Sequence, residues 1–182
     1  MAPFVALLQG INLGAKRRIG MPTLRQSMLA LGLTDVATYI QSGNVMFIAG
    51  ALSPQQLATR IGERIRSDFN LDVPVIVRSG DEIQRICTIN PFLPDEDDPK
   101  RLHVTFLDHA PGDQLVARLN DVTFPPDDYR VCGQDIFVRH VNGVSGSPID
   151  FARIARTLDI DHMTSRNWRT VTKLAEMARD RS

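Results

Sequence analysis

Apolar runs and segments of helical periodicity alternate along the first half of the chain. Four runs rich in branched and aromatic residues have the length of strands: residues 4–8, 36–40, 45–48 and 74–77. A helix is predicted from Pro22 to Gly32, and a second one follows Ser53, with Leu57 and Ile61 on one face. The order strand, helix, strand, strand, helix, strand is that of the ferredoxin-like, or split βαβ, arrangement.

The second half of the chain follows a similar order of patterns. Its predicted elements are a strand at 102–107, a helix at 111–119, a hairpin at 129–138, a helix around Phe151, Ile154 and Leu158, and a last helix that starts near Trp168. We therefore expect an α+β fold with two ferredoxin-like (βαββα) lobes, residues 1–90 and 101–182, the second ending in two helices. An acidic, proline-rich connection at 91–100 separates them. The duplication rests on element order alone, because no residue-level repeat is visible.

Two polar, glycine-bearing segments follow strands of the first lobe. One begins at Gly10 and ends in the basic residues 16–18, and the other is the turn 41–44. The two strands of a β-α-β unit run the same way, so their exits lie at one end of the sheet. We expect the two segments to share that edge, next to the positive amino-terminal end of the first helix, where an anion would bind favourably.

The candidate ligand-binding residues at this edge offer amides, a hydroxyl group and positive charge. They are Gln9, Gly10, Asn12, Gly14, Lys16, Arg17, Arg18, Gln41, Ser42 and Asn44. A purely structural interpretation is also open. In it the glycines allow positive φ at tight bends, and the side chains of Asn12 and Asn44 bond to nearby backbone.

A third polar segment, Thr164–Asn167, precedes the last helix and supplies candidates for its amino-terminal cap. It adds Arg166, Asn167 and Arg169 as candidate ligand-binding residues. Arg169 and Lys173 stand four residues apart on the predicted helix, where like charges repel and a nearby anion would relieve the repulsion. The alternative is a solvent-facing helix on which Glu176 lies near Lys173. The sequence does not decide whether this segment joins the first polar edge.

Composition narrows the class of protein. Lys plus Arg and Asp plus Glu both total 21, so no global field draws the chain to nucleic acid or anionic lipid. No stretch approaches the roughly 20 consecutive apolar residues of a bilayer span, and the start of the chain lacks the layout of a signal peptide. We expect a soluble cytoplasmic protein with no membrane partner. Cys87 and Cys132 lie far apart in the sequence, which predicts neither a disulfide nor a zinc site.

No motif for catalysis or for a cofactor is present. The chain has no Gly-x-Ser-x-Gly elbow, no His-Glu-x-x-His pair and no nucleotide-binding glycine pattern. The acidic run 95–98 lacks the glycine-bearing spacing of a calcium loop and is typical of a solvated linker. We expect no metal and no cofactor. Whether the protein is an enzyme, and its oligomeric state, stay open.

Three stretches carry a resemblance to a known family: Val5–Gly14, Thr38–Val45 with its Tyr-Ile-Gln-Ser-Gly-Asn string, and Thr164–Leu174. Together they resemble the mainly bacterial family catalogued as domain of unknown function 1697, over nearly the whole chain. The resemblance implies an α+β fold with two ferredoxin-like lobes and brings no established reaction, cofactor or catalytic residue. The family pattern usually has arginine where this chain has Gln9, and often glycine where it has Ala15. Loss of a fixed guanidinium weakens bidentate anion binding.

Three functions are therefore open. The leading hypothesis is binding of a small anionic or phosphate-bearing ligand at the edge formed by Gly10–Arg18 and Gln41–Asn44. The second is single-stranded nucleic-acid binding, which the zero net charge does not support, through Arg17, Arg18, Arg166, Arg169 and Lys173. The third is a ligand-free protein-interaction scaffold in which the polar segments only fix the join between the lobes.

Overall fold

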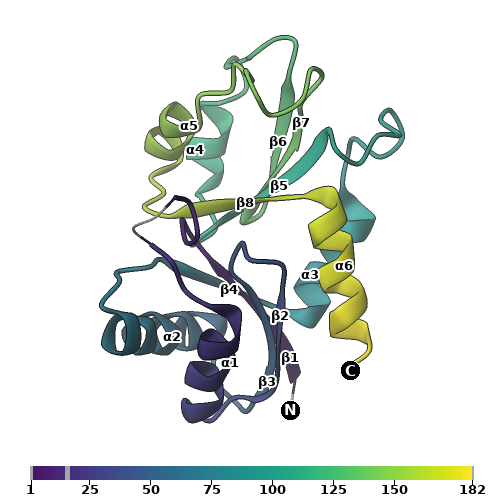
Figure 1. Ribbon diagram of the computed structural model, residues 1–182. Coiled ribbons are helices and arrows are strands. Elements are labelled where there is room, and N and C mark those ends of the chain that lie inside the picture. The colour runs from purple at the N-terminus through teal and green to yellow at the C-terminus, as the bar shows by residue number, and fades with distance from the viewer. Residues whose placement is uncertain (1, 15–16, 182) are drawn as a thin grey trace. The chain divides into compact units, whose positions relative to one another are not determined.

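The computed structural model describes residues 2–14 and 17–181 and divides the chain into two compact units (Figure 1). The first unit comprises residues 1–88 and 172–182, and the second comprises residues 89–171. Each unit contains one four-stranded antiparallel sheet. The expected α+β class with two ferredoxin-like lobes is confirmed. The candidate residue Lys16 lies outside the described residues.

The first unit builds its sheet in the order β2-β3-β1-β4. Its elements are β1 (Ala2–Leu8), α1 (Met21–Ala30), β2 (Thr34–Tyr39), β3 (Asn44–Ala49), α2 (Pro54–Phe69), β4 (Val75–Ser79) and α3 (Gly80–Ile89). Both β1 and β2 pair antiparallel with β3, so they run in the same direction although β3 lies between them. This is the sheet order and connectivity of the ferredoxin-like arrangement.

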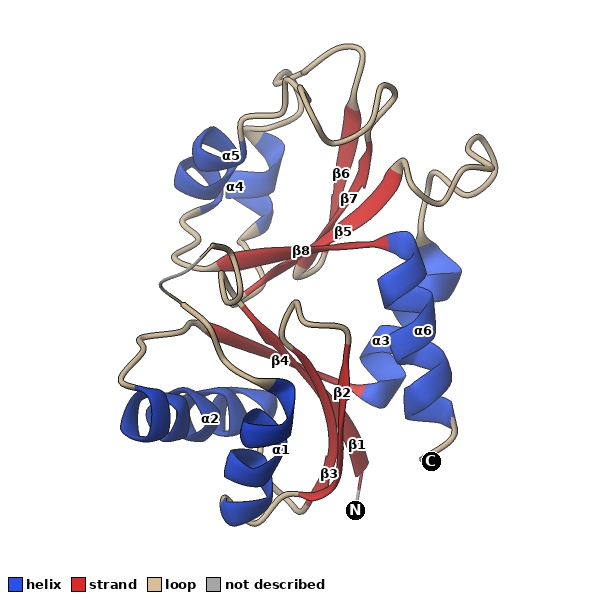
Figure 2. Cartoon of the chain, viewed as in Figure 1, coloured by secondary structure: helices blue, strands red, loops and turns tan. Residues whose placement is uncertain are grey.

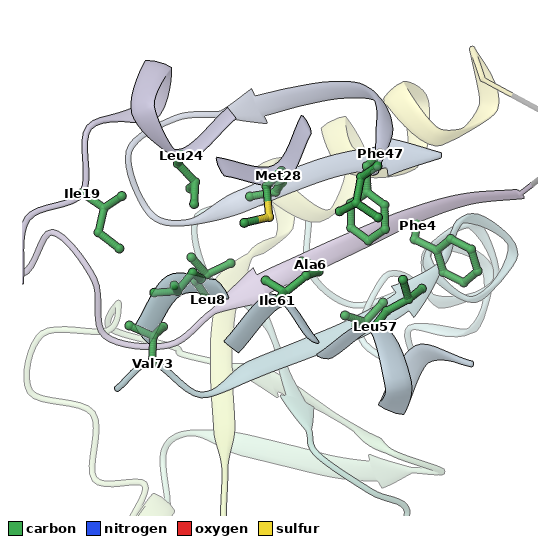
Figure 3. Close-up of a cluster of buried hydrophobic side chains, with 14 of the residues drawn as sticks. Phe4, Ala6, Leu8, Ile19, Leu24, Met28, Phe47, Leu57, Ile61 and Val73 are labelled. Carbon is green, nitrogen blue, oxygen red and sulfur yellow. The ribbon is translucent and has the colours of Figure 1, made fainter. Parts of the chain in front are cut away.

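Helices α1 and α2 cover one face of this sheet (Figure 2). The alternation of β1 sends Phe4, Ala6 and Leu8 to that face, because successive side chains of a strand point to opposite sides. They pack against buried side chains of the two helices, including Leu24, Met28, Leu57 and Ile61 (Figure 3). A capping box between Ser53 and Gln56 fixes the start of α2.

The second unit has the corresponding sheet order, β6-β7-β5-β8. Its elements are β5 (Leu102–Leu107), α4 (Asp113–Ala117), β6 (Asp128–Cys132), β7 (Asp135–Arg139), α5 (Phe151–Leu158), β8 (Met163–Asn167) and the start of α6 (Trp168–Arg179). Its core packs Leu107, Ile136 and Val138 of the sheet against Ile154 and Leu158 of α5. The second unit is therefore also a βαββαβ unit.

Strand β8 is the element that the sequence pattern missed. The segment Thr164–Asn167 was expected only to precede and cap the last helix, but it pairs antiparallel with β5. Buried and exposed positions alternate along this strand, but the buried residues, Thr164 and Arg166, are polar. Tertiary pairing with β5 overrides the weak strand signal of polar residues. Asn167 also fulfils its expected capping role, since its Oδ1 accepts from the N–H of Thr170 at 2.8 Å.

The end of the chain belongs to the first unit, whereas the lobes predicted from sequence were 1–90 and 101–182. The Arg181 guanidinium lies 2.7 Å from the carboxylate of Asp35 on β2. Gly80 at the start of α3 has no room for a side chain, because a Cβ there would lie 2.8 Å from Pro3 Cγ and 3.2 Å from Ala178 Cβ. These contacts between distant parts of the sequence are invisible in its local patterns.

Within the described part of the chain, none of the helices combines the length and the apolar character that a membrane span requires.

Candidate functional site

The exits of β1 and β2 meet at one end of the first sheet, as their common direction predicts. The side-chain amide of Asn12 donates to the carbonyl oxygen of Gln41 at 2.8 Å, which joins the loop after β1 to the turn after β2. The backbone N–H of Leu8 donates to the carbonyl of Gly43 at 2.8 Å. Two segments that are about thirty residues apart in sequence thus form one rim.

Asn12 acts as the clamp of this rim. Its Nδ2 donates to the carbonyl oxygens of Ile19, at 3.1 Å, and of Gln41, and its Oδ1 accepts from the N–H of Ile19 at 2.9 Å. Both N–H bonds of the side-chain amide are used in this way. The side chain therefore fixes the loop instead of facing a ligand, in agreement with the structural interpretation of the sequence.

Asn44 has the same kind of role on the other segment. It is fully buried, and its Nδ2 donates to the carbonyl of Tyr39 at 3.0 Å and to Ser42 Oγ at 2.9 Å. Gly43 completes the turn with a φ of +79°, and a Cβ there would lie 2.8 Å from Leu8 Cβ. The turn is therefore held against the end of β1 by a close fit that only glycine allows.

A hollow of about 590 Å³ lies beside this rim at the start of α1, and we name it the α1 hollow. It is lined by Asn12, Gly14, Arg18, Ile19, Gly20, Met21, Pro22 and Gln41. None of these residues is acidic. Arg18 is exposed and makes no ion pair or hydrogen bond within the described residues. Positive charge is therefore present in the hollow without a compensating carboxylate.

The amino-terminal turn of α1 adds a partial positive charge to the α1 hollow. Gly20 occupies the N-cap position, no side chain accepts from the first-turn N–H groups, and no acidic residue lies in that turn. The first N–H groups of a helix have no partner within the helix and together carry about half a positive charge. Pro22 lacks an N–H, which leaves those of Met21 and Thr23 without a capping side chain.

The sequence-predicted residues divide into two groups around the α1 hollow. Asn12, Gly14, Arg18 and Gln41 line it. The described candidates that do not line it are Gln9, Gly10, Arg17, Ser42 and Asn44. The structure thus brings four of the nine described first-lobe candidates together around one opening.

Two of the candidates outside the lining point toward the loop that precedes β4. The guanidinium of Arg17 donates to the carbonyl of Asp72 at 2.6 Å. Gln9 donates its backbone N–H to Pro74, while its Oε1 is buried without a hydrogen-bond partner among the described residues. Arg17 therefore contributes to the anchoring of the loop after β1.

Four lining residues were missed by sequence reasoning: Ile19, Gly20, Met21 and Pro22. They stand immediately before or at the predicted start of the first helix, and Pro22 was the signal for that start. A search of the residues around the predicted helix terminus would have found them, because first-turn N–H groups point out of that end of the helix.

The three candidates near the last helix belong to the second unit. Arg166 is buried on β8, where its guanidinium donates to Thr164 Oγ1 at 2.7 Å and to the carbonyl of Ser165 at 2.9 Å. Burial lowers the pKa of Arg166 to about 10. Asn167 caps α6, and Arg169 is exposed. Whether these residues join the first polar edge stays open.

Lys173 lies near Glu176, as the alternative interpretation of the last helix expected. Its ammonium group is 2.9 Å from the carboxylate of Glu176. This exposed pair accounts for the charge of Lys173 without a ligand. Such pairs contribute at most about 1 kcal/mol.

The second unit contains a buried polar cluster to which sequence reasoning assigned no role. Asp127 Oδ2 accepts from Ser147 Oγ at 2.6 Å and lies 3.0 Å from His140 Nδ1, which is 3.1 Å from the same Ser147 Oγ. A nucleophilic triad requires the serine and the carboxylate on opposite nitrogens of the imidazole. Here both contact Nδ1, so the cluster locks the loop after β7 and does not activate Ser147.

His103 lies next to this cluster, with its ring centroid 5.0 Å from that of His140 in an edge-on arrangement. Burial, together with the neighbouring His140, lowers the pKa of His103 to about 4. His103 is therefore neutral at pH 7. Among residues 2–14 and 17–181, no group of three or more His, Cys, Asp or Glu side chains could hold a metal ion.

Comparisons with known proteins support the fold. A family model described as protein of unknown function (DUF1697) matches residues 1–137. A solved structure, that of the conserved bacterial protein SP0830 from Streptococcus pneumoniae, aligns with a TM-score of 0.74 and 23% sequence identity over 98% of this chain and 99% of the other. At that identity the likeness establishes the fold alone. No curated protein matches the chain.

Proposed function

The chain belongs to the protein family of unknown function DUF1697, and we propose that it binds a small anionic or phosphate-bearing ligand in the α1 hollow. The observation that carries this proposal is the combination of charges around the opening. Arg18 is exposed and unpaired among the described residues, the first turn of α1 has no capping side chain, and the lining has no carboxylate. An anion would accept hydrogen bonds from the first-turn N–H groups and would balance the positive charge of Arg18.

The size of these interactions sets the expected affinity. A hydrogen bond to a charged group contributes about 1.5–3 kcal/mol, and a helix start contributes about 0.3–1 kcal/mol at an exposed site. Together they give about 2–4 kcal/mol, which corresponds to a dissociation constant of about 1–50 mM for a bare anion. Tighter binding requires contacts beyond the anionic group itself.

Asn12, which lines the α1 hollow, and Asn44 and Gly43, which do not, support the site by holding its rim in place. Their hydrogen bonds and close packing hold the loop after β1 against the turn after β2. A rim that is fixed before the ligand arrives loses less conformational entropy on binding. We therefore assign ligand contact to Arg18 and the α1 start, and positioning to the two asparagines.

The test is a calorimetric titration with inorganic phosphate at low ionic strength. Arg18→Ala should weaken phosphate binding about tenfold, since it removes the charged donor of the α1 hollow. Arg60→Ala is the matched control, because Arg60 is an exposed arginine on α2 of the same unit that makes no ion pair or side-chain hydrogen bond with the described residues. Equal loss of affinity in both variants, or no binding by the unmodified protein, would overturn the proposal.

A ligand-free interaction scaffold is the second candidate function. The observation that favours it is that the amide N–H groups of Asn12 and of Asn44 are already used within the chain. In this case the hydrogen bonds of the rim would serve only to stabilise the fold, and no anion would change the melting temperature. The nucleic-acid hypothesis has less support, because Arg17 and Arg166 already donate to groups of their own unit.

A further inference from the structure

We infer that the ligand of the α1 hollow is amphipathic, with an anionic head beside Arg18 and an apolar body over Leu13, Ile40 and Met21. This inference rests on the proposed function and names the class of ligand: a small monoester or acid with an aliphatic or aromatic part. It is carried by apolar side chains that the fold exposes next to the cationic opening.

Leu13 and Ile40 are the two apolar side chains at the rim. Leu13 is 76% exposed and Ile40 is 50% exposed. Leu13 follows Asn12 in the sequence and Ile40 precedes Gln41, and the 2.8 Å hydrogen bond between Asn12 and Gln41 fixes these two positions near one another. Each residue is therefore the chain neighbour of a residue that lines the α1 hollow, Leu13 on the loop after β1 and Ile40 on the turn after β2.

The lining of the α1 hollow is itself divided between polar and apolar groups. Ile19, Met21 and Pro22 present carbon atoms beside the guanidinium of Arg18. A purely inorganic anion would use only the polar part. An apolar body that extends from the anion would bury the carbon atoms of Met21 and Pro22 and then reach the rim.

The backbone of Ile40 agrees with a requirement for an apolar side chain at the rim. Its φ is +49°, a left-handed conformation that is unfavourable for a β-branched residue. Asparagine or glycine would adopt this conformation with less strain and would leave no carbon surface in water. A strained and exposed isoleucine is explained when its side chain contacts an apolar group.

The occupant is a small molecule rather than a protein or a membrane. A stable protein interface buries about 800 Å² on each partner, far more than Leu13 and Ile40 can offer. Anionic membranes attract clusters of about four to eight basic residues, whereas Arg18 is the only basic residue among those that line the described hollow. A volume of about 590 Å³ lies within the range of small-molecule sites.

The experiment compares two probes that share one anionic head, methyl phosphate and n-hexyl phosphate, by calorimetry. Each buried methylene contributes about 0.8 kcal/mol, or about a fourfold change in the dissociation constant, so partial burial of the chain should make the hexyl ester at least about tenfold tighter. Leu13→Ser and Ile40→Ser should each weaken the hexyl ester about threefold or more and leave the methyl ester unchanged.

Leu29→Ser is the control, because Leu29 is a 53% exposed leucine on α1 outside the lining, and it should change neither constant. Equal constants for the two esters would overturn the amphipathic ligand and leave the proposed function intact. A hexyl advantage that survives in both rim variants would also overturn it. Binding of neither ester would overturn the proposed function and this inference together.

Discussion

The two units use the same frame, and the ligand site that we propose lies in the first. The N–H of Leu8 at the end of β1 donates to the turn carbonyl of Gly43, and the N–H of Leu107 at the end of β5 donates in the same way to Gln134, at 3.0 Å. The connection to the following helix differs: residues 9–20 form it in the first unit and residues 108–112 in the second. The α1 hollow is lined in large part by this longer connection.

The correspondence extends to single residues of the fourth strands. Val5 pairs with Arg78 on β4, and Val104 pairs with Arg166 on β8, and both arginines are buried. The next residue caps the following helix in both units, as Ser79 accepts from the N–H of Glu82 and Asn167 accepts from that of Thr170. The frame is therefore duplicated in detail, and the longer connection of the first unit is where our proposed site lies.

The largest expected difference between the units concerns their hairpin turns. Gly43→Ala should cost about 3 kcal/mol of unfolding free energy, because it combines a φ of +79° with a Cβ contact of 2.8 Å to Leu8. Gly133→Ala is the counterpart in the second unit, with a φ of +63° but no atom within 4 Å, and should cost about 1 kcal/mol. Urea unfolding measures both, and equal losses would contradict the close fit at the site-bearing turn.

Asn12→Ala should have the next largest effect. The buried Ile19 would lose the acceptor of its N–H, and the rim would lose its link to Gln41, so we expect a loss of about 2 kcal/mol. The control is Asn142→Ala in the second unit. Asn142 is exposed and its side chain makes no hydrogen bond with the described residues, so this variant should stay within about 0.5 kcal/mol. Thermal unfolding compares them. Similar small changes in both would show that the clamp is dispensable.

His103 of the second unit should make the free energy of unfolding depend on pH, which gives a third comparison of the units. Its pKa of about 4 in the folded chain lies below the ordinary histidine value of 6.5, so between these pH values the unfolded chain binds a proton that the folded chain excludes. The free energy of unfolding should therefore fall as pH decreases from 6.5 to 4, by about 1–2 kcal/mol after allowance for solvent screening. The groups that affect this proton are His140, through its ring, and the carbonyl of Arg101, with Asp127 behind His140.

The variant His103→Phe copies the first unit, where Phe4 stands at the corresponding position opposite Ser79, as His103 stands opposite Asn167. It should flatten this part of the pH profile, measured as melting temperature between pH 4 and pH 7. An unchanged profile would assign the acid sensitivity to other groups.

The smallest effect in this series is a gain of stability. Ile40→Asn should raise the free energy of unfolding by about 1 kcal/mol, because asparagine tolerates a φ of +49° better than isoleucine does. Val144→Asn, at a 53% exposed position of the second unit without positive φ, should have almost no effect. A loss of stability in Ile40→Asn would mean that the side chain contributes to folding rather than to a ligand.

The sequence predicted the frame better than it predicted the site. The strand and helix patterns were strong wherever apolar residues faced a core. Strand β1 is buried at every position after Ala2, and the buried residues of α2, Leu57, Ile61 and Ile65, recur every four positions. Strand β8 was missed because its buried residues are Thr164 and Arg166, and their pairing with β5 depends on contacts about sixty residues apart.

For the candidate site, strand direction correctly predicted that the loop and the turn meet. It could not predict which side chains face the opening. Asn12 and Arg17 turn to carbonyl groups of Gln41 and Asp72, and only the folded backbone determines where those carbonyls lie. Arg18 differs from Arg17 by one position, yet it lines the α1 hollow. Adjacent basic residues look equivalent in a sequence and are not equivalent in space.

The most direct test of a site that only the first unit carries is a two-dimensional NMR titration of the labelled protein with inorganic phosphate. The account predicts saturable amide shifts at Gly14, Arg18, Gly20 and Met21, with no comparable shifts in residues 108–112 of the corresponding connection. Shifts of similar size in both connections, or none around the α1 hollow, would contradict it.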